Sequence, residues 1–144
     1  MTLTLKDIRD AIAGVIKQGY PQYKVYGSPT QQGAKPPCFF VFFLPDSKLK
    51  GQIGRLSLRE IGVDIVFYQE RNTVNTFQNA EDVADYLDEC MSRIPFGECF
   101  LGVHERSWEI EDELHYKFKI KERVYLPEND PELREIELYT GGVK

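Results

Sequence analysis

The residue types that most often perform chemistry are sparse in this sequence and form no catalytic pattern. The chain has only two histidines, His104 and His115. Either could act as a general base, but neither stands in an arrangement of Ser, Cys or carboxylate that is typical of a triad. Carboxylates on the exterior of a helix are usually solvated, and no catalytic pair is indicated among Asp82, Asp85, Asp88 and Glu89. The sequence therefore predicts no catalytic residues and a protein that is not an enzyme.

Metal and cofactor binding are not indicated either. The three cysteines, Cys38, Cys90 and Cys99, are widely spaced and fit neither a disulfide framework nor a zinc pattern. No HExxH motif occurs, and the Gly- and Pro-rich segment 27–37 lacks the patterns of a phosphate-binding loop. Each cysteine lies in or beside an apolar segment, which predicts three reduced thiols in the core. We expect neither a metal nor a cofactor.

The bulk composition is that of a globular protein. A chain of 144 residues is near the usual size of one domain, and we expect a single domain over 1–144 with 127–144 as a C-terminal extension. The longest apolar run, 38–44, is too short to span a bilayer, and the N-terminus lacks an apolar signal segment. The expected product is soluble and made in the cytoplasm. A net charge of −5 argues against general nucleic-acid binding.

Two helices are predicted from apolar stripes at helical spacing. The first begins after Thr4, which forms an approximate capping box with Asp7, and ends before Pro21. The second is expected from about Phe77 to Ile94, with Pro95 ending it.

The remaining segments predict strands. A short strand is expected at 23–26 and a central strand, buried on both faces, at 38–44. A loop is expected at 46–54, followed by a long strand with a bulge or a change of environment near Arg59 or Glu60. Two alternating segments, beginning at Phe100 and near Tyr116, complete the set. The predicted fold class is α+β, with a mainly antiparallel sheet of four to five strands packed by two helices.

The last two strands carry a row of charges. Basic or titratable residues share one face of the final strand, and acidic residues precede them: His115, Lys117, Lys119, Lys121 and Arg123 against Glu105, Glu109 and Glu111. A hairpin with a three-residue turn would place Glu111 opposite His115, Glu109 opposite Lys117 and Glu105 opposite Lys121. The other face would then pair Trp108 with Phe118 and Ile110 with Tyr116.

This row has two interpretations. A self-neutralised, solvated sheet face explains it without any partner, because exposed ion pairs contribute little stability. Alternatively it is a charged contact with another subunit, since rows of like charge can select partners and orientation.

Several motifs resemble those of bacteriophage tail terminators from phages and prophages of Gram-positive bacteria. The opening segment matches in Val25-Tyr26-Gly27, Gln32-Gly33 and Pro37-Cys38-Phe39-Phe40-Val41. Later segments agree in order: Asp64-Ile65-Val66-Phe67-Tyr68, the acidic helix through 82–87, and Leu114-His115-Tyr116. The resemblance spans most of the chain, from about Leu5 to Tyr125.

The resemblance implies a structural virion protein, assembled in the host cytoplasm, that forms a ring, usually a hexamer. Such a ring caps the head-proximal end of the tail tube and joins it to head-completion or connector proteins, with DNA passing through its lumen and no sequence-specific reading of nucleic acid. The candidate interface residues are Gln32, Lys35, Glu105, Glu109, Glu111, Lys117, Lys119, Lys121 and Arg123. The alternatives are another tail-head junction subunit, such as a connector adaptor or tail-tube-like protein, or a small ligand-binding protein or hydrolase with segment 27–37 as a lid.

Overall fold

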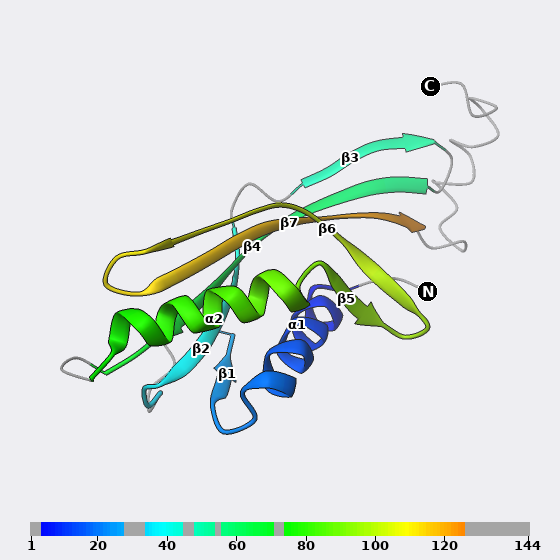
Figure 1. Ribbon diagram of the computed structural model, residues 1–144. Coiled ribbons are helices and arrows are strands. Elements are labelled where there is room, and N and C mark those ends of the chain that lie inside the picture. The colour runs from blue at the N-terminus through cyan, green and yellow to red at the C-terminus, as the bar shows by residue number, and fades with distance from the viewer. Residues whose placement is uncertain (1–3, 28–33, 45–47, 54–55, 71–73, 126–144) are drawn as a thin grey trace.

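The computed structural model describes residues 4–27, 34–44, 48–53, 56–70 and 74–125, with the backbone alone described at 48–53, 56–58 and 123–125. It contains helices α1 (Leu5–Gly19) and α2 (Thr76–Cys90). The strands are β1 (Lys24–Tyr26), β2 (Cys38–Phe43), β3 (Lys48–Ile53), β4 (Leu56–Tyr68), β5 (Arg93–Phe96), β6 (Cys99–Ile110) and β7 (Leu114–Tyr125). Both helices lie on the same side of one curled sheet (Figure 1). The predicted α+β class is confirmed.

The sheet is larger and more mixed than the sequence predicted. Its strands follow the order β1-β2-β4-β7-β6-β5, and β3 pairs in addition with β4. The pair β1–β2 is parallel, whereas β4 is antiparallel to β2, β3 and β7. The prediction of four to five antiparallel strands was therefore wrong. The sheet gains two short strands, β3 and β5, because the free edges of the long strands β4 and β6 complete their backbone hydrogen bonds.

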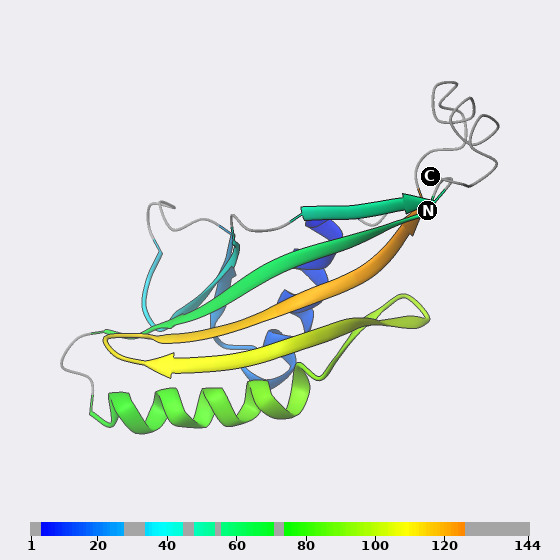
Figure 2. The ribbon, with the colours of Figure 1, turned by 90° about the horizontal axis from the view of Figure 1, so that it is seen from above.

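Strand β4 organises the sheet because it is long enough to serve two neighbours on one edge. Its last six residues pair with β2 and its first five with β3, while β7 pairs along the other edge from Leu56 to Phe67 without a register shift. The sequence predicted a bulge or a change of environment near Arg59 or Glu60. The bulge is absent from this pairing, but β4 changes its neighbour on one edge after Glu60, from β3 to β2. The register shift lies between Lys50 and Gln52 of β3. The predicted loop at 46–54 is mostly strand β3. Figure 2 shows β3 and the adjoining parts of β4 and β7 extending beyond the helices.

Helix α1 begins as predicted. The Thr4 hydroxyl accepts a hydrogen bond from the Asp7 N–H at 3.0 Å, and the Asp7 carboxylate accepts one from the Thr4 N–H at 3.1 Å. This capping box satisfies two free N–H groups of the first turn and holds the pKa of Asp7 below its ordinary value. The apolar stripe of α1 is buried, with Ile8, Ile12 and Ile16 fully inaccessible.

Helix α2 is shorter than predicted. It ends at Cys90, and Ile94 is buried from strand β5 instead of from the helix. Pro95, which cannot donate a ladder hydrogen bond, stands on this edge strand. Gly97, at φ 62°, makes the tight turn from β5 to β6.

The main core lies between the helices and one face of the sheet. Strand residues alternate into it from β4 and β7 and meet the apolar stripes of α1 and α2: Ile61, Val63, Ile65, Tyr116, Phe118, Ile120, Val83 and Leu87. The opposite face of the sheet, called here the outer face, carries a small second cluster around Cys38, Phe40 and Val66. Among the described residues, no helix is long and apolar enough to cross a membrane.

Candidate functional site

The charged face of β6 and β7 exists, but its register differs from the predicted one. Glu109 lies opposite His115 and Trp108 opposite Tyr116, whereas Glu111 was expected opposite His115 and Trp108 opposite Phe118. The connecting loop is residues 111–113, closed by a 3.2 Å hydrogen bond from the Glu111 N–H to the Glu113 carbonyl. This placement makes Leu114 the first residue of β7, where it is fully buried. The register differs from the predicted one by two residues, so Trp108, Glu109 and Ile110 keep their expected faces.

Two of the predicted ion pairs nevertheless form. The Lys117 Nζ lies 3.6 Å from the Glu109 carboxylate and the Lys121 Nζ lies 3.2 Å from the Glu105 carboxylate. The first pair is diagonal across the strands, which long side chains can reach. Both pairs are largely exposed, so each contributes about 0–1 kcal/mol at most. The face is therefore partly self-neutralised.

A bulge in β6 aims Glu105 at Lys121. The pairing of β6 with β7 shifts between His104 and Ser107, and Glu105 has φ 55° in the left-handed region. A bulge inserts one extra residue and bends its strand. Without it, one of the two halves of β6 would turn its apolar side chains, Val103 or Ile110, away from the core. The sequence pattern of residues 103–110 reads as one uninterrupted alternation, so it did not indicate this inserted residue.

Of the two remaining basic residues of the row, the structure describes the side chain of Lys119 but not that of Arg123. Lys119 lies opposite His104 on the outer face, and no ion pair of Lys119 is present among the described residues. Arg123 stands in β7 opposite Leu58, and its side chain lies outside the described part of the chain.

His115 has a partner that the sequence did not reveal. Its Nδ1 lies 3.0 Å from Oδ2 of Asp64 in the neighbouring strand β4. Asp64 is 7% exposed, and its other oxygen, Oδ1, is buried without a hydrogen-bond partner among the described atoms. His115 lies half-buried on the outer face with the basic row. Asp64, the one charged residue among the apolar residues of 61–67, was the available signal for this pair.

Of the two candidate interface residues in the Gly- and Pro-rich segment, Gln32 lies outside the described residues. Lys35 is exposed beside a shallow groove of about 370 Å³ lined by Tyr23, Tyr26, Pro36 and Pro37 among others. The described residues that line this groove include no histidine or carboxylate.

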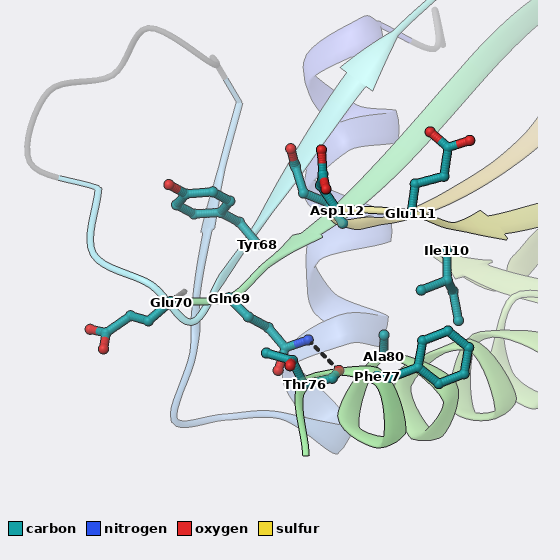
Figure 3. Close-up of a pocket in the computed structure, with 10 residues that line it drawn as sticks. Tyr68, Gln69, Glu70, Thr76, Phe77, Ala80, Ile110, Glu111 and Asp112 are labelled. Carbon is teal, nitrogen blue, oxygen red and sulfur yellow. Dashed lines mark hydrogen bonds between the residues drawn. The ribbon is translucent and has the colours of Figure 1, made fainter. Parts of the chain in front are cut away.

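A larger groove, which the sequence did not indicate, lies at the end of the molecule where α2 begins and the β6–β7 loop turns. Its volume is about 560 Å³, and it is lined by residues from three elements: Tyr68, Gln69, Glu70, Thr76, Phe77, Ala80, Ile110, Glu111, Asp112 and Glu113. Gln69 joins β4 to α2 by donating to the Thr76 carbonyl at 2.7 Å and accepting from the Asn79 amide at 3.2 Å. Figure 3 shows Phe77 and Ile110 next to each other at one side of the groove.

The contact between His115 and Asp64 lies away from both grooves, since neither residue lines them. Within the described residues no group of three or more His, Cys, Asp or Glu is arranged to hold a metal ion. Cys38 is buried, Cys90 half-buried and Cys99 exposed at the start of β6, so the prediction of three core thiols was wrong for Cys99. Burial raises the pKa of the Cys38 thiol, which disfavours the reactive thiolate.

Two side chains of the sheet, Tyr116 and Arg106, bond to Asp88 of α2. The Tyr116 hydroxyl donates to the Asp88 carboxylate at 2.7 Å, and the guanidinium of Arg106 donates to the Asp88 carbonyl at 2.6 Å. Burial raises the pKa of Tyr116 strongly, and the hydrogen bond to Asp88 raises it further.

Comparison with known proteins agrees with this description. No curated protein matches the chain in a sequence comparison. The family model described as "Phage tail terminator protein" matches residues 7–132, which is most of the chain. The resemblance noted from the motifs is thereby confirmed. The chain belongs to a family of phage tail terminator proteins.

Proposed function

We propose that the protein forms a ring of identical subunits at the head-proximal end of the phage tail, where it ends the tube and contacts the head-completion or connector proteins. The observation that carries this proposal is the family match over 7–132, which makes the chain a structural protein of the virion tail. In this role the protein acts through surfaces and not through catalysis.

The outer face of the sheet supports a contact with the tube or connector protein. It is not covered by either helix, and it carries Lys117, Lys119 and Lys121 side by side on β7. Glu109 and Glu105 neutralise two of these lysines. Among the described lysines of the row, Lys119 is then the one left to attract an acidic partner.

Mass photometry of the purified chain, alone and with purified tail tubes, tests the proposal. We expect a discrete ring, either free or at one end of each tube in electron micrographs. A chain that stays monomeric and never binds tubes would contradict it. A ring bound along the whole tube, and not at its end, would instead indicate a tube-like subunit.

A further inference from the structure

The groove at the α2 end of the molecule combines an apolar wall with an acidic rim. Phe77 is 60% exposed in the first turn of α2, and Val74, just before the helix, is 79% exposed. Phe77, Ala80 and Ile110 line the apolar side. An aromatic ring this exposed beside a hollow is typical of a contact surface, because aromatic residues are enriched where proteins meet.

The rim of this groove is negative. Glu70 follows β4, and Glu111, Asp112 and Glu113 form the β6–β7 loop. No Lys or Arg is among the described residues that line it. A partner that fills the groove must therefore bring an apolar group together with a positive charge.

The opposite end of the same molecule presents such a pair of groups. In the β5–β6 hairpin, Pro95 lies opposite Phe100 and Arg93 opposite Gly102. Alternation along the strands puts Arg93, Pro95 and Phe100 on one face, while Ile94 and Leu101 are buried on the other. Phe100 is 51% exposed, and the Arg93 guanidinium carbon lies 4.5 Å from the centre of its ring. This cation–π contact holds a positive charge against the exposed ring.

The two surfaces lie at opposite ends of the protein. In both Figure 1 and Figure 2 the β6–β7 loop and the start of α2 are at one end of the long sheet, and the β5–β6 hairpin is at the other. A surface at one end therefore cannot reach the groove of its own molecule. It can reach the groove of a neighbouring copy.

We propose that Phe100, together with Arg93, docks into the groove of the next copy of this chain, with Phe100 against Phe77 and Ile110 and with Arg93 facing the carboxylates of Glu111 and Asp112. Such a contact joins two different patches, and repetition of a head-to-tail contact closes a ring when the rotation permits it. The inference rests on the proposed ring and identifies the contact that builds it.

Substitutions in the β5–β6 hairpin test the contact. The variants Phe100→Ser and Arg93→Glu are compared with the wild type by mass photometry across a concentration series, with and without tail tubes. We expect each variant to need a protein concentration at least about tenfold higher than the wild type to form rings. The reason is that a central aromatic or Arg contact often dominates an interface. The combination of Arg93→Glu with Glu111→Arg and Asp112→Arg should restore rings. Circular dichroism and thermal unfolding verify that each variant is folded.

Cross-linking tests the same contact by a second route. Pro95 is exposed and lies opposite Phe100 on the same face of the hairpin, so Pro95→Cys and Glu111→Cys, combined in a Cys99→Ser background, place one thiol on each proposed surface. Mild oxidation should give a ladder of disulfide-linked multimers in a denaturing gel. The ladder should vanish when either new cysteine is omitted, and it should not form when Glu111→Cys is replaced by Gln18→Cys on α1.

The outcomes separate this inference from the proposed function. If Phe100→Ser and Arg93→Glu form rings as readily as the wild type, and Pro95→Cys with Glu111→Cys gives no ladder, the contact is overturned and the ring remains. A wild-type chain that remains monomeric with and without tubes would overturn both.

Discussion

The His115 imidazole and the Asp64 carboxylate lie in contact across β7 and β4, with Nδ1 and Oδ2 3.0 Å apart. Asp64 is among the few buried polar residues of the described chain, and its Oδ1 has no partner there. A buried carboxylate that loses its hydrogen-bond partner incurs most of its desolvation penalty. The contact is therefore expected to stabilise the outer face of the sheet.

We predict that His115→Ala lowers the free energy of unfolding by about 1–3 kcal/mol, because Asp64 then remains buried without its partner. Urea denaturation at neutral pH measures the change. Adding Asp64→Asn to this variant should recover part of the loss, since it removes the charge that was left unpaired. Lys119→Ala, on the same face, is the matched control and should change stability by less than about 0.5 kcal/mol. Equal stability of His115→Ala and wild type would show that the contact contributes nothing.

A second prediction concerns stability at alkaline pH. The Tyr86 hydroxyl in α2 donates to the Val15 carbonyl in α1 at 2.7 Å, and burial is the main cause that raises the pKa of Tyr86 to about 12. Because the fold favours the neutral phenol, its contribution is complete below the ordinary pKa of about 10 and is lost as the pH rises toward 12. Tyr86→Phe should cost about 1 kcal/mol at neutral pH.

The same substitution should flatten the decline in stability between about pH 10 and pH 12. Thermal unfolding measured across this range in wild type and Tyr86→Phe provides the comparison. Some decline should persist in the variant, because the pKa of Tyr116 is raised as well. An identical alkaline decline in both proteins would contradict the assignment to Tyr86.

The close approach of α1 to Tyr86 gives a third prediction. A Cβ added to Gly19, the last residue of α1, would overlap the Tyr86 ring, whereas one added to Gly14 meets nothing within 4 Å. Gly19→Ala should therefore destabilise the protein by about 1–3 kcal/mol by displacing the ring and its hydrogen bond to Val15. Gly14→Ala, within the same helix, should be neutral or stabilising by up to about 1 kcal/mol. Chemical denaturation of the two variants tests this contrast, and equal effects would refute it.

The basic row gives a fourth prediction, about assembly. Lys119→Glu reverses a charge of the outer face without breaking either ion pair found there, those of Lys117 and Lys121. We expect it to leave stability within about 0.5 kcal/mol of wild type while reducing the binding of the ring to tubes or connector protein. Electron microscopy of assembled tails measures the binding, with Lys17→Glu on α1 as the control of equal charge change. Normal tails with Lys119→Glu would favour a row that is simply solvated.

The sequence carried the local signals of this fold well. The capping box at Thr4, the apolar stripes of both helices and the alternation of β7 correspond to the structure. The strand predicted at 38–44 is present as β2, but only residues 38–41 of it are buried. Each depends on residues within one element, where periodicity and side-chain chemistry act directly. The family resemblance likewise depended on local motifs, and the family match confirms it.

The elements that sequence reasoning missed depend on neighbours distant along the chain. Segment 48–53 reads as a loop, but it is a strand because the first part of β4 offers it a free edge. Ile94 fits the stripe of α2, yet it reaches the core from β5 because that segment pairs with β6. The bulge at Glu105 reconciles two halves of β6 that would otherwise face opposite ways.

By itself the sequence determined the fold class, the family and the scarcity of catalytic groups, since these are written in composition, spacing and local motifs. Only the tertiary structure decided which groups meet. It gave His115 its partner in a strand 51 positions away, joined the start of α2 to the β6–β7 loop in one groove, and put Phe100 at the far end of the molecule. These meetings depend on strand register and on the order of strands in the sheet. Both are decided by burying side chains from several elements at once, so no single segment of the sequence encodes them.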